Sequence, residues 1–155
     1  MAYYTAAGTI LSVVSEVPSE LTDDATDGFP SLTYAVVGEV TSVPSHGAEY
    51  ALVTHNPIGD RVTRKLKGSV NYGSLTIPMA LDVDDAGQDI MRDHSDGANV
   101  DDLASFEVAY PDGTTEYFTG LVMSFTTAGD GVDSILAAEA MIEIDSSVVT
   151  VEPTS

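Results

Sequence analysis

The sequence predicts a mainly β fold: a two-sheet β-sandwich or a partly closed barrel flanked by one short α-helix, with a long loop and extended termini. Most of the chain alternates apolar and polar residues with the two-residue period of strands, and turn residues separate these runs. Only one segment, 84–94, has a helical pattern. With 155 residues the chain is expected to form a single domain, 1–155, large enough to bury a core without covalent staples.

The N-terminal third predicts three strands and one long loop. Residues 9–14 form a short β-rich run, and residues 32–43 alternate along their whole length. Between them, residues 15–31 hold two prolines and five acidic residues, which is typical of a loop. Residues 48–54 predict a further strand, which ends in a turn at 56–60.

A long alternating strand and the helix follow. The strand places one set of residues on a single face: Gly73, Leu75, Ile77, Met79, Leu81 and Val83. Pro78 has no amide hydrogen, so this strand should lie at a sheet edge or carry a bulge there. In the helix, Asp84 or Asp85 can cap the N-terminus, and Gly97 can end it. Its expected apolar face consists of Val83, Ala86, Ile90 and Met91.

The C-terminal part predicts three strands, 103–110, 115–127 and 132–145. Pro111-Asp112-Gly113 is a tight turn between the first two, and 128–131 turns the chain into the third. The last strand has an apolar face of Leu136, Ala138, Ala140, Ile142 and Ile144. Its other face carries acidic residues and is expected to meet water or a charged partner. Residues 146–155 show no pattern.

The charge balance limits the possible partners. There are 25 acidic and 5 basic residues, which gives a formal net charge of −20, yet 43% of the residues are hydrophobic. A chain this apolar is expected to fold and to carry its acids on the surface. Such a surface repels nucleic-acid phosphates, so specific DNA binding is not expected. Life in high salt is another explanation of the acidity, compatible with the first.

No pattern for catalysis or for a cofactor is present, so the chain is not expected to be an enzyme. There is no cysteine, no phosphate-binding glycine motif and no serine at a nucleophile elbow. His46, His55 and His94 lie in separate segments without the spacing of metal ligands. Asp82, Asp84, Gly87 and Asp93 resemble parts of a calcium loop, but its fifth and twelfth positions do not fit, and we interpret the match as coincidence.

Neither a membrane segment nor a secretory signal is expected from the sequence. Its apolar runs are shorter than the roughly 20 residues of a transmembrane helix. The first ten residues lack a charged region followed by an apolar one. We therefore expect synthesis in the cytoplasm.

The basic residues are strongly clustered. Four of the five, Arg61, Arg64, Lys65 and Lys67, fall within seven residues beside a turn. On so acidic a molecule this segment is expected to dock on an acidic surface, of which another copy of the chain is the most available. Unlike patches that meet head to tail generate rings or filaments. The alternative is a solvated basic loop, because surface ion pairs alone contribute little.

Taken in order, several segments resemble the major tail tube protein of long-tailed bacteriophages and gene transfer agents. They are Val-Val-Gly-Glu-Val-Thr-Ser-Val at 36–43, the long loop with Gly-Asp-Arg at 59–61 and Lys67-Gly68, and the strand before the helix 84–94. The most specific pieces besides 36–43 are Tyr-Pro-Asp-Gly-Thr at 110–114 and Phe-Thr-Gly at 118–120. The resemblance covers most of the chain.

The resemblance implies a subunit of hexameric rings that stack into a tube. A tape measure protein would occupy the lumen during assembly, tail tip and terminator proteins would bind the tube ends, and DNA would later pass through without specific binding. It implies a place in the tail of a virion or virus-like particle made in the bacterial host. Arg61, Arg64, Lys65 and Lys67 would lie in an inter-ring or inter-subunit contact. The candidates for an acidic lumen are Glu139, Glu143 and Asp145, with Glu107 a weaker one.

A second function remains open from the sequence. An acidic β-sandwich can also be a binding module for a cation or a glycan, such as a virion decoration or an adhesion domain.

Overall fold

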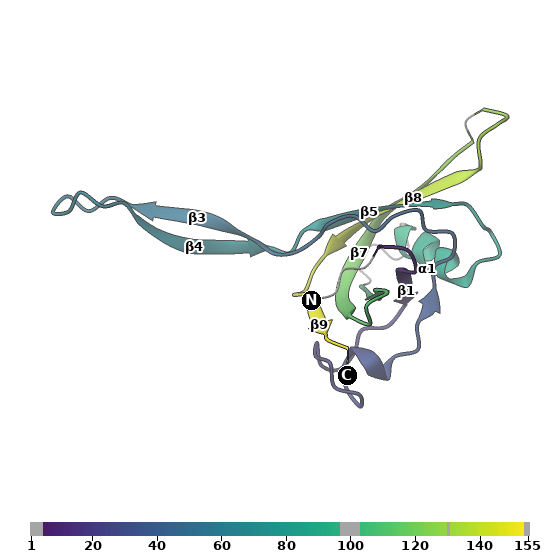
Figure 1. Ribbon diagram of the computed structural model, residues 1–155, viewed down its shortest axis with the longest axis horizontal. Helices are drawn as coiled ribbons and strands as arrows, with labels where there is room; N and C mark the ends of the chain where they lie inside the picture. Colours follow the sequence, from purple (N-terminus) through teal and green to yellow (C-terminus); the bar gives the residue numbers. More distant parts are fainter. Residues whose placement is uncertain (1–4, 97–102, 130, 154–155) are drawn as a thin grey trace.

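The computed structural model describes residues 5–96, 103–129 and 131–153 (Figure 1). Within these residues the chain forms nine strands, one 3-10 turn and one α-helix, all connected by turns and loops. The elements are β1 (Ile10–Val14), the 3-10 turn (Phe29–Ser31), β2 (Ala35–Val36), β3 (Glu49–His55), β4 (Arg64–Asn71), β5 (Ser74–Ala80), α1 (Ala86–Ser95), β6 (Ala104–Ala109), β7 (Thr115–Ala128), β8 (Ala137–Ile144) and β9 (Val149–Val151).

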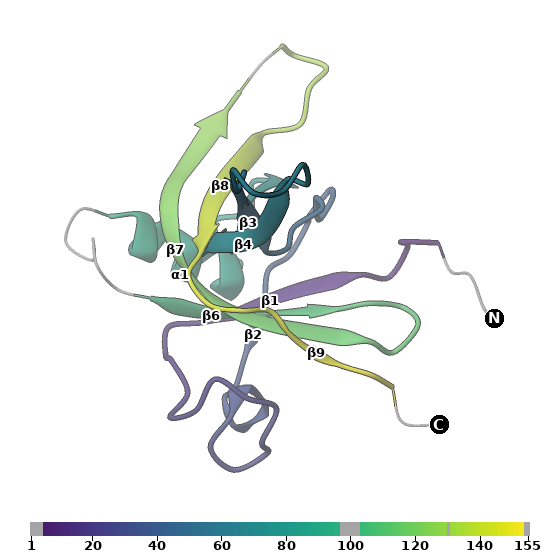
Figure 2. The same cartoon turned by 90° about the vertical axis from the view of Figure 1, so that its left-hand side faces the viewer.

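Seven strands form one antiparallel sheet in the order β2-β1-β6-β7-β8-β5, with β9 paired to β7. The 14-residue strand β7 joins two parts of this sheet. Its first half pairs with β6 and β9, and its second half pairs with β8. The register shifts between Val122 and Ser124, and an extra residue of this kind bends a strand. Figure 2 shows β7 changing direction along its length.

The core lies between the two parts of the bent sheet and α1. Strand alternation sends every second side chain inward, so β1, β5, β6, β7 and β8 each contribute two to four buried apolar residues. Phe106 and Phe118 stack with their ring centroids 5.3 Å apart. The buried cluster comprises Leu11, Val13, Val37, Leu75, Ile77, Met79, Met91, Ala104, Phe106, Val108, Phe118, Val122, Ala138, Ala140, Ile142 and Ile144. The predicted mainly β fold with one short helix is confirmed, and the sheet does not close into a barrel.

The helix is confirmed with Asp85 as its N-cap. The Asp85 carboxylate accepts the Gln88 N–H at 2.9 Å, as a capping residue does three positions before its donor. Met91 is fully buried and Ile90 half-buried, as expected. The prediction that Val83 and Ala86 belong to the apolar face is wrong. Val83 lies in the turn before the helix and is 63% exposed, and Ala86 is also exposed. The predicted helix end at Gly97 falls outside the described residues.

The prediction from Pro78 is confirmed, because β5 is the last strand of the sheet order. Pro78 pairs with Glu139 of β8 on one side. On the other side its carbonyl accepts the Thr41 N–H at 2.8 Å, and a single bridge joins Val40 to Met79. The Pro78 nitrogen, which carries no hydrogen, therefore faces the sheet edge, where no complete set of strand hydrogen bonds requires a donor.

The strand predicted over 32–43 is wrong for most of its length, since only β2 and the Val40 bridge have strand pairing. The N–H of Gly38 donates to Asp85, and its carbonyl accepts from the Gln88 side chain. Glu39 then takes a positive φ of 60°. The helix start thus supplies partners that a neighbouring strand would otherwise provide, and the chain leaves the sheet after Val36.

The predicted last strand and tail also need correction. β8 begins at Ala137, not at 132, and the preceding residues belong to a hairpin end that projects beyond the body (Figure 1). Leu136, expected in the core, is 59% exposed because no opposing layer reaches that far. The tail, for which the sequence shows no pattern, forms β9, where Val149 pairs with Tyr117 of β7.

The acidic loop 15–31 is confirmed as a loop and folds against the sheet. Phe29 is fully buried and stacks on Tyr117 with a centroid distance of 5.6 Å. The Ser105 hydroxyl donates to the Glu16 carbonyl at 2.6 Å, which ties the start of the loop to β6. Asp24 accepts the backbone N–H groups of Thr26 and Asp27, and these two bonds lower the pKa of its carboxyl. The loop is therefore anchored at both ends while its acids face water.

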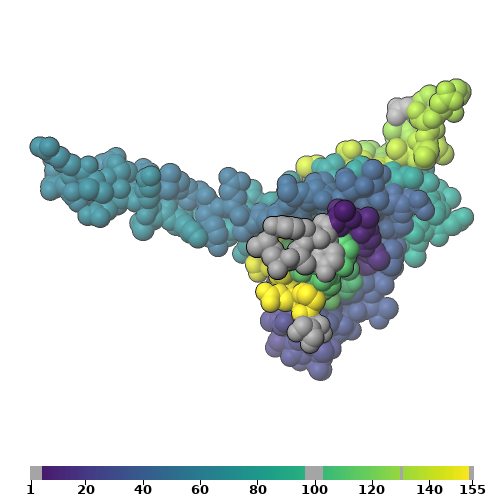
Figure 3. Space-filling view, in the orientation of Figure 1, coloured from purple at the N-terminus to yellow at the C-terminus, as the bar shows by residue number. Residues whose placement is uncertain are grey.

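Two hairpins give the molecule its shape. The β3-β4 hairpin extends far from the body, and the end of the β7-β8 hairpin forms a second, shorter projection (Figure 3). Across the described part of the chain, no helix has both the length and the apolar character required to cross a membrane.

Candidate assembly surface

The projecting hairpin, residues 49–71, is called the arm. Its strands β3 and β4 form a separate two-stranded antiparallel sheet, joined by the tip 56–63. Every residue of β3 is exposed, and in β4 only Gly68 and Val70 are half-buried. The expected long loop is thus a strand over 64–71, which pairs with β3 to form a β-ribbon. The body covers neither the edges nor the faces of this ribbon.

Local sequence explains this ribbon. Residues 49–55 are rich in residues that favour strands, and Pro57 and Gly59 lie in the tip, where a turn is needed. The register shifts between Tyr50 and Leu52, where Gly68 and Ser69 of β4 form a bulge opposite Ala51 of β3. At Gly68 a Cβ would come within 2.9 Å of the Val53 side chain, so the close approach of the strands favours glycine.

Both faces of the arm combine basic and apolar side chains. Residues directly opposite each other in an antiparallel ribbon point to the same side. Leu52 pairs with Lys67 and Thr54 with Lys65 on one face. Val53 pairs with Leu66 and His55 with Arg64 on the other. The exposed apolar residues of the arm are Tyr50 (49%), Leu52 (66%), Val53 (46%), Ile58 (107%), Val62 (53%) and Leu66 (66%).

The four predicted docking residues all lie on the arm. Arg64 forms an ion pair with Asp60 at 2.7 Å, and the Lys67 ammonium lies 4.7 Å from the centroid of the Tyr50 ring. Both contacts are exposed, and such pairs contribute little to stability. Arg61 at the tip has no ion pair within the described parts of the chain. The basic groups are therefore available to a partner.

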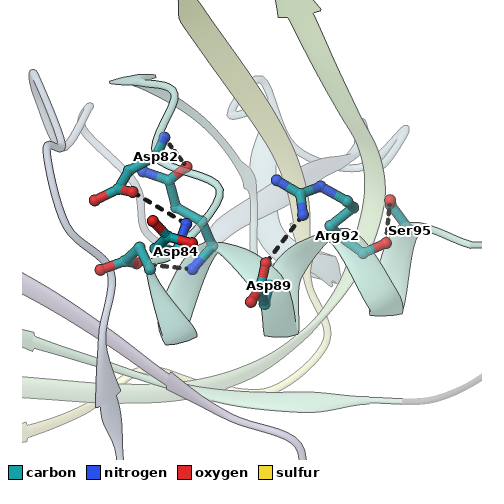
Figure 4. Close-up of polar contacts among 7 residues, drawn as sticks. Asp82, Asp84, Asp89, Arg92 and Ser95 are labelled. Atoms are coloured by element: carbon teal, nitrogen blue, oxygen red, sulfur yellow. Dashed lines mark hydrogen bonds and ion pairs between the residues drawn. The ribbon is translucent and has the colours of Figure 1, made fainter.

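The charge of the molecule is divided between the arm and the rest. The arm carries four basic residues against Glu49 and Asp60, a formal charge of +2. The remaining residues carry 23 acids and one base, Arg92, a formal charge of −22. Arg92 pairs with Asp89 at 2.9 Å (Figure 4), and its guanidinium lies 5.2 Å from the Phe125 ring centroid. The one base outside the arm is thus engaged within its own chain.

The predicted lumen residues fall in two places. Glu139 and Glu143 lie on the outward side of β8 with Met141 between them, and Asp145 follows directly after the end of the strand. Glu139 and Asp145 are exposed and Glu143 is half-buried. Glu107 lies apart, on β6 opposite Tyr117 and beneath the acidic loop. The Glu107 carboxylate is hydrogen-bonded to the Tyr117 side chain, whereas the acids on and after β8 face away from the body.

The tyrosines beneath the acidic loop are held in their neutral form. Burial, then the negative charge of Glu107 and the hydrogen bond to it, raise the pKa of Tyr117 to about 12. Burial also raises the pKa of Tyr34, whose hydroxyl donates to the Phe29 carbonyl at 2.9 Å. These groups pack the loop against the sheet and are not poised for proton transfer at neutral pH.

The three histidines do not come together. His55 is exposed on the arm, and His94 is buried on α1. The side chain of His46, which precedes the arm, is buried, with Nδ1 3.1 Å from the Pro44 carbonyl and Nε2 3.3 Å from the Glu116 carboxylate. The Tyr110 hydroxyl donates a hydrogen bond to the same carboxylate. This cluster fixes the segment that leads into the arm against the β6-β7 turn.

The calcium-like stretch serves the helix start. Asp82 Oδ1 accepts the Asp84 N–H at 3.0 Å, and the Asp82 N–H donates to the Gln88 side chain (Figure 4). Asp85, which the calcium pattern does not include, is the capping residue. Among the described residues, no group of three or more acidic or histidine side chains is arranged to hold a metal ion.

A groove of about 690 Å³ lies where the N-terminal segment, residues 40–43 and the β6-β7 turn meet. Its lining includes Ala6, Thr41, Ser42, Tyr110, Pro111 and Asp112. Asp112 is the one charged side chain among its described lining residues. The sequence analysis missed this groove, because the three segments are distant in sequence. It also missed the apolar residues of the arm, although the alternation at 50–54 could have drawn attention to them.

Comparisons with known proteins identify solved structures that have a similar fold. No family model and no curated protein matches the sequence. Twenty-two chains of solved structures match. One belongs to the "Cryo-EM structure of the anti-feeding prophage (AFP) baseplate, 6-fold symmetrised", with a TM-score of 0.68 and 9% identity over 100% of this chain and 99% of that one. Another belongs to "an Extracellular Contractile Injection System, PVC sheath/tube terminator in extended state", with a TM-score of 0.65 and 12% identity over 97% and 98%. The chain thus has the fold of proteins found in contractile injection assemblies.

Proposed function

We propose that this protein is a non-enzymatic structural subunit of a phage-tail-like particle, which self-assembles into stacked hexameric rings that form a tail tube. The observation that carries the proposal is the arm: a long ribbon that exposes six large apolar and four basic side chains on an otherwise acidic molecule. Several large exposed apolar side chains together with clustered charge are typical of an interaction site.

The energetics of the arm favour a role in assembly. A two-stranded ribbon without a third strand or a packed layer is only marginally stable in water. Burial of one leucine or isoleucine side chain contributes about 1.5–3 kcal/mol, so a partner that covers Leu52, Ile58 and Leu66 can stabilise both the ribbon and the contact. Arg64, Lys65 and Lys67 add attraction to the acidic body of another copy. Such a contact joins unlike surfaces and therefore leads to rings or open stacks.

The acids of β8 suit the wall of a DNA-conducting lumen. Glu139, Glu143 and Asp145 form a line on a sheet face that no other described element covers. A negatively charged wall repels phosphate and lets DNA pass without sticking. Glu107 fits this role less well, because it is half-buried and bonded to Tyr117.

The comparisons support the particle and its symmetry. The matched chains come from a baseplate described as 6-fold symmetrised and from a sheath/tube terminator. By analogy we propose that this chain assembles with itself in sixfold rings, encloses a tape measure protein, and meets tail tip and terminator proteins at the tube ends. Its place is the tail of a virion or virus-like particle.

Negative-stain electron microscopy of the purified protein over a range of concentrations tests the proposal. Rings or tubes with an axial hole are the expected result. A monodisperse monomer at the highest concentration would contradict it. A rise in melting temperature with added calcium in a protein that stays monomeric would instead favour a cation-binding module.

A further inference from the structure

We propose that the tip of the arm docks into the groove between the N-terminal segment, residues 40–43 and the β6-β7 turn of a second copy. The inference rests on the proposed function and names the surface that receives the arm. It is argued from the chemistry of the tip, the chemistry of the groove and the distance between them within one chain.

The tip is suited to insertion. Ile58 is fully exposed, at 107%, between Pro57 and Gly59, so it presents an apolar side chain at the end of the ribbon. Asp60 is already paired with Arg64 at 2.7 Å. Arg61 is thus left as the cation beside Ile58, with no ion pair in the described part of the chain.

The groove has the complementary chemistry. Ala6, Tyr110 and Pro111 supply apolar contact area, and Thr41 and Ser42 supply neutral polar groups. Its single charged lining residue is the acid Asp112, which is exposed at the β6-β7 turn. A volume of about 690 Å³ is several times that of one isoleucine side chain and fits a short turn. An apolar tip with one cation therefore meets an apolar groove with one anion.

The arm cannot reach its own groove. β3 has seven residues, and a strand rises about 3.3 Å per residue, so the ribbon carries the tip roughly 20 Å or more from its base. Figure 1 shows the arm leading away from the body, while the groove is built from body segments. Ile58 and the groove can therefore meet only between two copies, in a head-to-tail contact that repeats from subunit to subunit.

Cysteine cross-linking tests this contact, because the natural sequence contains no cysteine. Ile58→Cys protein is mixed with Thr41→Cys, Ser42→Cys or Pro111→Cys protein, assembled, and treated with a short bismaleimide. A cross-linked heterodimer is expected with at least one groove variant. Glu139→Cys on β8 is the control and is expected to give none. Assembled tubes in which Ile58→Cys links to Glu139→Cys, or to no groove position, would overturn the docking and leave the proposed function standing.

A second measurement uses the charge pair. Arg61→Gln and Asp112→Asn are each expected to raise the critical concentration for assembly by about two- to fivefold, the range of an exposed ion pair. Asparagine keeps the acceptor that Asp112 Oδ1 offers to the Thr114 N–H at 2.9 Å, so the turn is preserved. The critical concentration of the double variant should be no higher than that of the single variant with the larger effect. Effects that multiply would show that the two residues act independently and contradict their pairing. If the natural protein forms no rings or tubes, both the proposed function and the docking proposal are wrong.

Discussion

The carboxylate of Asp85 accepts two backbone N–H groups that lie far apart in sequence: that of Gln88 at 2.9 Å and that of Gly38 at 3.0 Å. The first bond caps α1. The second holds the chain where the alternation of residues 32–43 had predicted a continuous strand. One side chain therefore both starts the helix and ends β2.

Replacement of Asp85 by alanine removes both bonds. We expect Asp85→Ala to lower the free energy of unfolding by about 1–3 kcal/mol, because a helix cap is lost and the Gly38 N–H loses its partner. Asp85→Asn keeps an acceptor and should cost less than half as much. Urea unfolding followed by far-UV circular dichroism measures both variants. Equal losses would show that charge, and not hydrogen-bond acceptance, is what Asp85 supplies.

Gly87 allows α1 to approach β2. A Cβ at this position would lie 2.5 Å from the Val36 carbonyl oxygen and 2.7 Å from the Val37 Cα, both backbone atoms that cannot move alone. Gly87→Ala should therefore lower the free energy of unfolding by about 1–3 kcal/mol, despite the higher helix propensity of alanine.

Gly59→Ala is the matched control, because nothing lies within 4 Å of a Cβ there. Thermal unfolding should show a clearly lower melting temperature for the Gly87 variant and little change for the Gly59 variant. A stabilised Gly87→Ala protein would mean that helix propensity outweighs the close approach.

Tyr117 predicts a loss of stability at alkaline pH. Its pKa is raised to about 12 by burial and by Glu107, against about 10 in an unfolded chain. The unfolded state loses this proton first, so the stabilisation is complete below pH 10 and is lost as the pH rises to 12. Tyr117→Phe should reduce the slope of stability against pH in this window. Part of the slope should remain, because the pKa values of Tyr34 and Tyr110 are also raised. Urea unfolding at a series of pH values measures the slope, and an unchanged slope would refute the assignment.

The basic residues of β4 predict a specific assembly defect. Arg64→Gln combined with Lys65→Gln should raise the critical concentration for tubes about tenfold or more while the fold stays intact, since both side chains are exposed. Ser19→Glu combined with Ala25→Glu is the control. Each double variant has a formal net charge of −22, two below the natural −20. Comparable defects in both would attribute the effect to general repulsion, and normal tubes from the first would remove β4 from the contact.

The marginal stability of an isolated ribbon predicts a change in hydrogen exchange. Amides of β3 and β4 should exchange fast in the monomer and become protected at least about tenfold in the assembled state, because a packed layer then covers them. The amides of β6 serve as an internal reference, since this strand lies between β1 and β7 in both states. Fast exchange of the arm within intact tubes would mean that the arm stays free.

Much of the fold was predictable because local patterns had no tertiary competitor. Leu75, Ile77 and Met79 alternate and are buried, and Pro78 marked the sheet edge. The tight turn at 111–113 forms as expected, with the Gly113 N–H donating to the Tyr110 carbonyl at 3.0 Å. The candidate site was predicted in part: the basic cluster was visible in the sequence, but its place on a projecting ribbon was not.

The sequence by itself determined the strand alternation, the capped helix and the separation of four bases from the acids, because these depend on residue type and spacing over a few positions. Only the tertiary structure decided where 32–43 leaves the sheet, since Asp85 accepts the Gly38 N–H and Gln88 donates to the Gly38 carbonyl from 47 and 50 residues away. It also decided that β3 and β4 find no covering layer, and that Thr41, Tyr110 and Asp112 line one groove. Contacts between distant segments depend on how the whole chain closes around its core, which no local pattern contains.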